Sequence, residues 1–438
     1  MTRRFPLLLA LVLFAATGCD VPVRHLDTGG IALAGAGGSG SQREGAAGAG
    51  GASRQEPACV RGFVVVSSDY QSSNVSLLDP TGEVLSASFL SSGSTSAGLS
   101  APLSGDVVLP TRSARTDRTV LIDRSPASVL TWVDLRSGEV TAQLSVATGF
   151  ASNPHDYIEL SASKAYVLRY EKNLTSGQEP FDEGDDVLVV DPSAPAITGR
   201  IELTPALADV APRFLAHPER AALAGDRVVV VLGAYRADFL ETAPSRLVAI
   251  DPVTDAIVQT LVLDGYRACS SLAVSPDEDE LAVACAGEWG GDNRPGLDTS
   301  GVVRVRIADQ LEIAHRHRAA DFGPDPVAAG LAYASRGRLL FTTYGHDAEP
   351  DESAAEDRLI ELDLQTSEAR EVLRSAGEPF TLGDVRCDAA CGACFVVDAE
   401  RDGGIVHRFA VTPGGVSEPT AIRVENEIGL PPRCLGDF

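Results

Sequence analysis

The sequence predicts an all-β fold, a seven-bladed β-propeller with four-stranded antiparallel blades. Three observations predict it: a turn motif that recurs at one period, short apolar runs ahead of each copy, and almost no helical periodicity. A repeat architecture also suits the length, because the chain exceeds the size that one hydrophobic core usually serves.

The recurring motif is an apolar run, usually an aspartate, a short turn and a second β-rich run. Two further copies, which match this motif only in part, lie at 305–309 and 407–411. The motif aspartates are Asp79, Asp134, Asp191, Asp251 and Asp363. Successive aspartates lie 55, 57, 60 and 112 residues apart, and the last step spans two periods. The chain therefore holds seven units of one period.

Further apolar runs precede each motif copy and supply the other strands of each unit. They lie at 63–66, 107–109, 165–168, 228–232, 281–284, 339–342 and 395–397. Gly, Pro, Asp and Ser bound these runs, which is typical of short strands joined by turns. The tail Gly429–Leu435 resembles the starts of inner strands elsewhere, so we expect it to complete the blade that begins with Cys59–Val66.

The first eighteen residues have the layout of a secretory signal, with Arg3 and Arg4 ahead of an apolar stretch too short to span a bilayer. The junction ATGC at 16–19 resembles the lipobox of bacterial prolipoproteins. This resemblance implies cleavage before Cys19 and a lipid on its thiol; secretion without a lipid is the alternative.

Residues 29–52 are almost entirely Gly, Ala and Ser, the composition of a flexible linker. We therefore expect a signal peptide at 1–18, a lipidated N-terminus and linker at 19–58, and the propeller at 59–438. The expected location is the cell envelope, with the lipid in a bacterial membrane on the periplasmic side or the cell surface. Which membrane holds it stays open.

A formal net charge of −25 argues against nucleic acid as a partner. We expect a monomer without a cofactor or a metal ion. The acidic loops at 182–186 and 347–357 lack the alternating spacing of a calcium loop, which favours a solvated surface and leaves Ca²⁺ binding open.

Seven cysteines follow Cys19, and disulfides are the default expectation in an exported protein. The alternatives for the cluster at 387–394 are a redox-active Cys-x-x-Cys and a zinc site. The expected pairs are Cys59–Cys434, as a latch on the ring, and Cys269–Cys285 and Cys387–Cys394, each across an inner hairpin, with Cys391 left over.

Loop length separates the two faces of the predicted ring. Short turns share one face, while long loops at 111–128, 171–186, 287–301 and 344–357 share the other. Long loops on a rigid scaffold favour binding. The residues just ahead of the inner strands line the channel mouth on that face; the candidates are His155, Arg213, Arg267 and Arg433.

These candidates predict a site for an anionic small ligand or a carboxylate-bearing glycan. Ion pairing with acidic neighbours such as Asp156, Asp325 or Asp384 is the alternative. The sequence carries no Gly-x-Ser-x-Gly elbow and its histidines are scattered, so no catalytic residue is assigned. His155 is the one candidate general base.

The stretch VDLRSGEV at 133–140 resembles the blade motif of YVTN-type, lactonase-like seven-bladed propellers, and the resemblance covers about residues 59–438. That motif occurs in enzymes and in non-enzymatic binders. The first hypothesis is a membrane-anchored scaffold, not an enzyme, that binds a protein, peptide or glycan through its long-loop face. The second is a lactonase-like or quinoprotein-like enzyme at the channel mouth, and the third is a structural envelope lipoprotein.

Overall fold

The computed structural model describes residues 59–113, 117–288, 296–347, 354–376, 379–400, 403–424 and 427–438. The predicted signal segment, Cys19 and most of the linker lie outside these residues. No helix among the described residues is long and apolar enough to cross a membrane.

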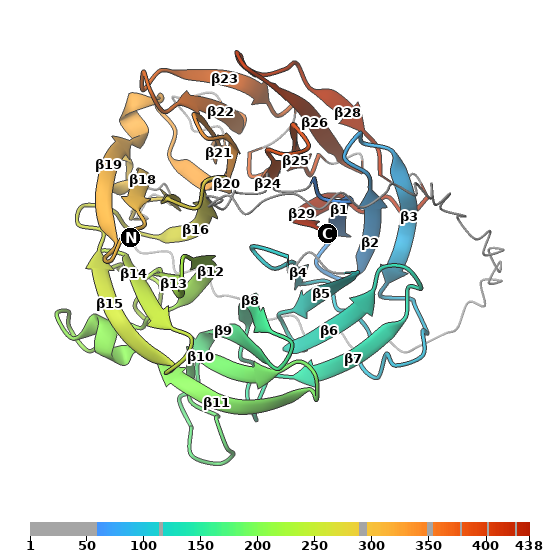
Figure 1. The fold of residues 1–438 in the computed structure, drawn as a ribbon, viewed down its shortest axis with the longest axis vertical. Coiled ribbons are helices and arrows are strands. Elements are labelled where there is room, and N and C mark those ends of the chain that lie inside the picture. The colour runs from blue at the N-terminus through green and yellow to red at the C-terminus, as the bar shows by residue number, and fades with distance from the viewer. Residues whose placement is uncertain are drawn as a thin grey trace, which may run out of the picture. The chain divides into compact units, whose positions relative to one another are not determined.

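The described residues form a seven-bladed β-propeller, as predicted (Figure 1). From the axis outward, blade 1 holds β29 (Pro432–Asp437), β1 (Phe63–Ser68), β2 (Ser73–Leu78) and β3 (Val84–Ser91); blade 2 holds β4 (Val107–Val108), β5 (Arg118–Asp123), β6 (Val129–Asp134) and β7 (Val140–Ser145); blade 3 holds β8 (Pro154–Ser161), β9 (Lys164–Lys172), β10 (Gly184–Asp191) and β11 (Ala196–Glu202); and blade 4 holds β12 (Pro218–Ala224), β13 (Arg227–Leu232), β14 (Arg246–Asp251) and β15 (Ala256–Val262).

The remaining blades follow the same order. Blade 5 holds β16 (Cys269–Val274), β17 (Glu280–Cys285), β18 (Gly301–Arg306) and β19 (Glu312–Arg318); blade 6 holds β20 (Val327–Ser335), β21 (Arg338–Thr343), β22 (Arg358–Asp363) and β23 (Ala369–Arg374); and blade 7 holds β24 (Leu382–Asp388), β25 (Ala393–Asp398), β26 (Ile405–Thr412) and β28 (Thr420–Ile422), with the short β27 (Gly415–Val416) beside β26. Among the described residues, three short 3₁₀ turns lie at Thr204–Leu207, Leu297–Thr299 and Ala319–Asp321.

The ring closes in blade 1, where the C-terminal strand pairs with the first strand of the propeller. Antiparallel pairing places Phe63 opposite Asp437 and Val66 opposite Cys434. A hydrophobic cluster fills each junction between neighbouring blades, including the junction of blade 7 with blade 1, where the Phe63 and Phe395 rings lie 4.4 Å apart. The predicted closure by the tail is confirmed.

The motif aspartates have one shared role, at the turn between the third and fourth strands of a blade. Each carboxylate accepts the backbone N–H of the residue two positions later, as in an Asx turn. These bonds are Asp79 to Thr81 and Asp134 to Arg136, at 2.8 and 2.9 Å, and Asp191 to Ser193, Asp251 to Val253 and Asp363 to Gln365, each at 2.8 Å. The repeat in the sequence is therefore a repeat of turn chemistry.

A second repeated contact joins each blade to the next in the five junctions from blade 2 to blade 7. A side-chain oxygen at the start of a third strand accepts backbone N–H groups where the next blade's inner strand begins. These inter-blade acceptors are Ser128, Asp185, Ser245, Ser300 and Asp357. The acidic loops are therefore not wholly solvated, since Asp185 and Asp357 are buried.

The predicted long loop at 111–128 needs correction in two respects, its continuity and its position. The expected long loop at 111–128 is interrupted by β5, because the polar stretch around Arg118 conceals an apolar strand. Its first part, beyond β4, lies at the end of the axis opposite the long loops. The other predicted long loops join second and third strands, as expected.

The disulfides confirm two predicted pairs and correct the third. Cys269–Cys285 and Cys387–Cys394 form as expected. The predicted Cys59–Cys434 bond is wrong, because Cys59 bonds to Cys391 and Cys434 is a free thiol. In the antiparallel pair of β1 and β29, Cys434 lies opposite Val66, so the chain ahead of Phe63 extends away from it.

Candidate functional site

The inner strands all run in one direction along the central axis, which gives the channel two unlike ends (Figure 1). The end where inner strands begin is called the entry face here, and the end where they finish is called the exit face. The long loops join second strands to third strands, so they lie on the entry face. The predicted mouth residues also lie there, ahead of or at the start of inner strands.

A histidine and a glutamate from neighbouring blades meet at the entry face. His155, at the start of β8, places its Nδ1 2.9 Å from Oε2 of Glu219, at the start of β12. The two side chains are 14% and 11% exposed, so both reach the surface of the mouth. The imidazole stacks on the ring of Tyr170, with centroids 4.1 Å apart. A carboxylate at Nδ1 favours the tautomer that leaves the Nε2 lone pair available.

Aromatic rings continue from Tyr170 across the mouth. The His217 ring lies 4.4 Å from Tyr170 and 5.1 Å from Phe239, and Tyr235 lies 5.8 Å from Phe239. Phe239 is 48% exposed and its neighbour Leu240 is 73% exposed, which makes an apolar rim beside the His155–Glu219 pair. Such a rim offers flat faces to a ligand.

The tyrosines around Glu219 keep their protons at every physiological pH. Burial, the nearby Asp357 and Glu219 raise the pKa of Tyr344 to about 12. Burial and then Glu219 also raise the pKa of Tyr170 and that of Tyr235. These phenols therefore stay protonated and can donate hydrogen bonds.

The inter-blade acceptor Asp185 fixes the backbone that carries Glu219. Its carboxylate accepts the N–H groups of Ala216 and His217 at 3.0 and 2.6 Å. His217 has a φ of 45°, a left-handed conformation that a histidine adopts at a cost in strain. Burial raises the pKa of Asp185 to about 6 and lowers the pKa of His217 to about 4, so His217 is a neutral ring at neutral pH.

A cavity of about 330 Å³ opens at the other side of the same mouth. Its lining includes Tyr70, Tyr344, Asp384, Arg433 and Cys434. The Arg433 guanidinium lies 5.0 Å from the centroid of the Tyr70 ring. Burial and the nearby Asp384 raise the pKa of the Cys434 thiol to about 12, so this cysteine is no thiolate nucleophile.

The four predicted mouth residues do not share one pocket in the described part of the chain. His155 contacts Glu219, and Arg433 lines the entry cavity. Arg213 pairs with Glu241 at 2.6 Å, and Arg267 lies 3.4 Å from a carboxylate oxygen of Glu288. Two of the three arginines are thus neutralised by glutamates that the sequence analysis did not single out.

Glu219 and the tyrosines were missed as site residues, although a signal for Glu219 exists. Pro154–His155, Pro218–Glu219 and Pro432–Arg433 each place a polar residue directly after a proline at the start of an inner strand. Aligning the blades on this proline would have placed Glu219 beside His155. No comparable pattern marks Tyr170, Tyr235 and Tyr344, which come from loops and strand ends.

Among the described residues, one group of potential metal ligands converges: Cys59, Asp388 and Cys391. Both of its sulfur atoms belong to the disulfide that joins Cys59 to Cys391, so neither is a thiolate ligand.

Comparisons with known proteins agree on the fold. No protein-family model and no curated protein matches the sequence. Solved structures similar to this chain include a protein from Lactobacillus plantarum, with a TM-score of 0.57, 12% identity, and coverage of 87% of this chain and 100% of that one. The periplasmic gluconolactonase PpgL of Pseudomonas aeruginosa gives a TM-score of 0.56, 14% identity, and coverage of 87% and 99%. A putative 6-phosphogluconolactonase from Bacteroides fragilis gives a TM-score of 0.54, 12% identity, and coverage of 86% of this chain and 97% of that one. At such identities, the similarity shows the fold alone: the chain is a seven-bladed β-propeller whose structural neighbours include lactonase-like proteins.

Proposed function

We propose that the entry mouth binds a small polyhydroxylated lactone and hydrolyses it, as the lactonase-like hypothesis expects. One observation carries this proposal: the contact of His155 with Glu219 inside a mouth walled by aromatic rings. Two structural neighbours, the periplasmic gluconolactonase and the putative 6-phosphogluconolactonase, add support from the fold. The quinoprotein alternative has no comparable support.

The proposed reaction uses His155 as the general base. Glu219 accepts the Nδ1–H, and Nε2 takes a proton from a water molecule as its oxygen attacks the lactone carbonyl. The tetrahedral oxyanion receives a hydrogen bond from a neutral phenol, Tyr235 or Tyr344, whose raised pKa keeps the proton in place. The carbon–oxygen bond of the ring then breaks, and the imidazolium returns its proton to the leaving oxygen. The product is the open hydroxy acid.

A lactonase assay on the full chain tests this proposal. Glucono-1,5-lactone consumption should exceed the uncatalysed rate, and His155→Gln should lower kcat/KM at least ~100-fold, the usual contribution of a general base. Glu219→Ala should lower it as well. His315→Gln is the matched control, because His315 lies exposed on the outer strand β19 and should leave the rate unchanged. No turnover above background, or full activity in His155→Gln, would contradict the proposal.

Binding without catalysis is the second candidate, in line with the hypothesis of a scaffold for a protein, peptide or glycan. The exposed Phe239 and Leu240 beside the mouth favour it, because exposed apolar side chains that adjoin a polar site mark binding surfaces. The same lactonase assay separates the two candidates. Calorimetry that shows a bound glycan with no turnover, and weaker binding in Phe239→Ser, would favour the scaffold.

We also propose that the propeller is held at a membrane through a lipid on Cys19. The described chain begins at the exit face, where the disulfide joins Cys59 to Cys391 in the turn between β24 and β25. An anchor that leaves from this face would leave the entry mouth accessible.

Metabolic labelling tests the anchor. Cells that express the full chain with labelled palmitate should yield labelled protein in the membrane fraction, whereas Cys19→Ala should carry no label and leave that fraction. A wild-type chain without label would overturn the lipid anchor, and a cleaved, unlabelled chain would favour plain secretion.

A further inference from the structure

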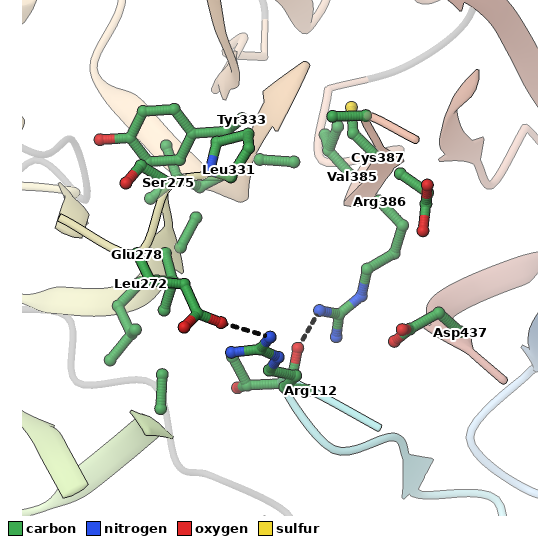
Figure 2. Close-up of a pocket in the computed structure, with 18 of the residues that line it drawn as sticks. Arg112, Leu272, Ser275, Glu278, Leu331, Tyr333, Val385, Arg386, Cys387 and Asp437 are labelled. Carbon is green, nitrogen blue, oxygen red and sulfur yellow. Dashed lines mark hydrogen bonds and ion pairs between the residues drawn. The ribbon is translucent and has the colours of Figure 1, made fainter. Parts of the chain in front are cut away.

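A second cavity, of about 200 Å³, opens at the exit face (Figure 2). It lies among the ends of inner strands from blades 4 to 7 and blade 1 and the beginning of the chain beyond β4 in blade 2. It shares none of its lining residues with the entry cavity that Arg433 and Tyr344 line. The proposed lactonase chemistry makes no use of it.

The residues beyond β4 extend across this end of the channel. Arg112, from blade 2, pairs with Glu278, from blade 5, at 2.9 Å, although the two residues are 166 positions apart. Arg386, from blade 7, donates to the carbonyl oxygens of Pro110 and Leu435 at 3.0 and 2.8 Å and also to that of Thr111. These contacts hold one wall of the cavity in place.

Apolar side chains also line the cavity. Leu272, Leu331 and Val385 are only 3%, 6% and 3% exposed, and Figure 2 shows Leu272 beside Glu278 and Val385 beside Arg386. They come from the inner strands of blades 5, 6 and 7, so a rigid scaffold holds them. These side chains suit a branched or aromatic hydrocarbon group.

Two opposite charges on the first wall lack charged partners among the described residues. Arg386 donates to carbonyl groups, and none of its contacts with described residues is an ion pair. No described carboxylate therefore lies within 4.0 Å of its nitrogen atoms. The Asp437 carboxylate has one contact, the Ser113 N–H at 3.4 Å. Figure 2 shows both side chains at the same side of the cavity. Partly buried charges without an ion pair favour a ligand that supplies the opposite charges.

We propose that the exit cavity binds an α-amino acid with an apolar side chain. The ligand carboxylate would pair with Arg386, its ammonium group with Asp437, and its side chain with Leu272, Leu331 and Val385. The volume agrees, because a cavity of 200 Å³ is below the range for drug-sized ligands and suits a molecule of amino-acid size. Glu278, already neutralised by Arg112, does not oppose the carboxylate.

Calorimetry on the full chain with three probes tests this site. The binding of L-leucine should reach saturation at a ligand concentration of ~10 mM. The deaminated analogue 4-methylpentanoate and the decarboxylated analogue 3-methylbutylamine should each bind at least tenfold more weakly. Asp437→Asn keeps an acceptor for the Ser113 N–H but removes the negative charge. It should therefore weaken the binding of leucine at least tenfold and leave the binding of 4-methylpentanoate unchanged. Asp309→Asn, an exposed position on blade 5, is the matched control.

Each alternative result overturns the proposal. No leucine binding at that concentration excludes the site, and equal affinity for 4-methylpentanoate shows a plain carboxylate site instead. Unchanged leucine affinity in Asp437→Asn, with a wild-type melting curve, shows that leucine binds elsewhere. His155→Gln should bind leucine like the wild type, so the outcome does not depend on the lactonase proposal.

Discussion

Replacing Cys59 and Cys391 together by alanine is expected to lower the free energy of unfolding by about 6 kcal/mol on the chain-entropy model. This disulfide joins residues 332 positions apart, so in the chain-entropy model it restricts the unfolded chain far more than a local bridge does. It also fastens the chain just ahead of β1 to blade 7, next to the blade that closes the ring. Urea denaturation of the oxidised proteins measures the loss.

The control is the double alanine variant of Cys269 and Cys285, a bridge that spans 16 residues within one hairpin. Its expected loss is smaller, about 3 kcal/mol on the same model. If the Cys59/Cys391 variant loses no more free energy of unfolding than this control, the β1–β29 pairing closes the ring without a contribution from the disulfide. Equal denaturant slopes in both variants are needed for the comparison.

The fold could be predicted from the sequence because turn chemistry repeats. Each motif aspartate serves its own turn, so a local pattern reveals a local structure, and five such patterns with two degenerate copies imply the ring. The closing strand at Pro432–Asp437 could be predicted for the same reason, since it resembles other inner strands. The polar residues around Arg118 hid β5, because its apolar core is short and its flanks resemble a loop.

The third disulfide and the site could be predicted only in part, because they depend on contacts between blades. The prediction of a Cys59–Cys434 disulfide assumed that the pairing of β1 with β29 places the two cysteines opposite each other. The register of the two strands decides which residues lie opposite each other, and the sequence of neither strand indicates that register. His155 was identified as a candidate base by its place before an inner strand. Its partner Glu219 belongs to another blade, 64 positions away.

The inter-blade acceptors were also absent from the sequence analysis, although they decide how neighbouring blades fit. Asp357 makes the largest set of such contacts, because its carboxylate accepts three N–H groups at the start of blade 7 as well as that of Gly345 in its own blade 6. Its two carboxylate oxygens accept the N–H groups of Gly345 at 2.7 Å, Phe380 at 2.9 Å, Thr381 at 2.6 Å and Leu382 at 2.9 Å. The residue is 1% exposed, so water cannot replace the carboxylate without a rearrangement. Other blades use a serine at this position, Ser245 or Ser300, with fewer bonds.

Asp357→Ala is therefore expected to lower the free energy of unfolding by about 3–5 kcal/mol, because it leaves four backbone donors without an acceptor in a buried junction. Asp357→Ser should lose about half as much, because one hydroxyl restores the contact that blades 4 and 5 make to their neighbours. Asp309→Ala, at an exposed site, should change stability by less than about 0.5 kcal/mol. If Asp357→Ser lowers the free energy of unfolding as much as Asp357→Ala, the stability that Asp357 provides does not come from accepting these hydrogen bonds. If alanine costs as little as the exposed control, the junction between blades 6 and 7 is held by its apolar cluster alone, and the repeated acceptors set the register of the blades without contributing to their stability.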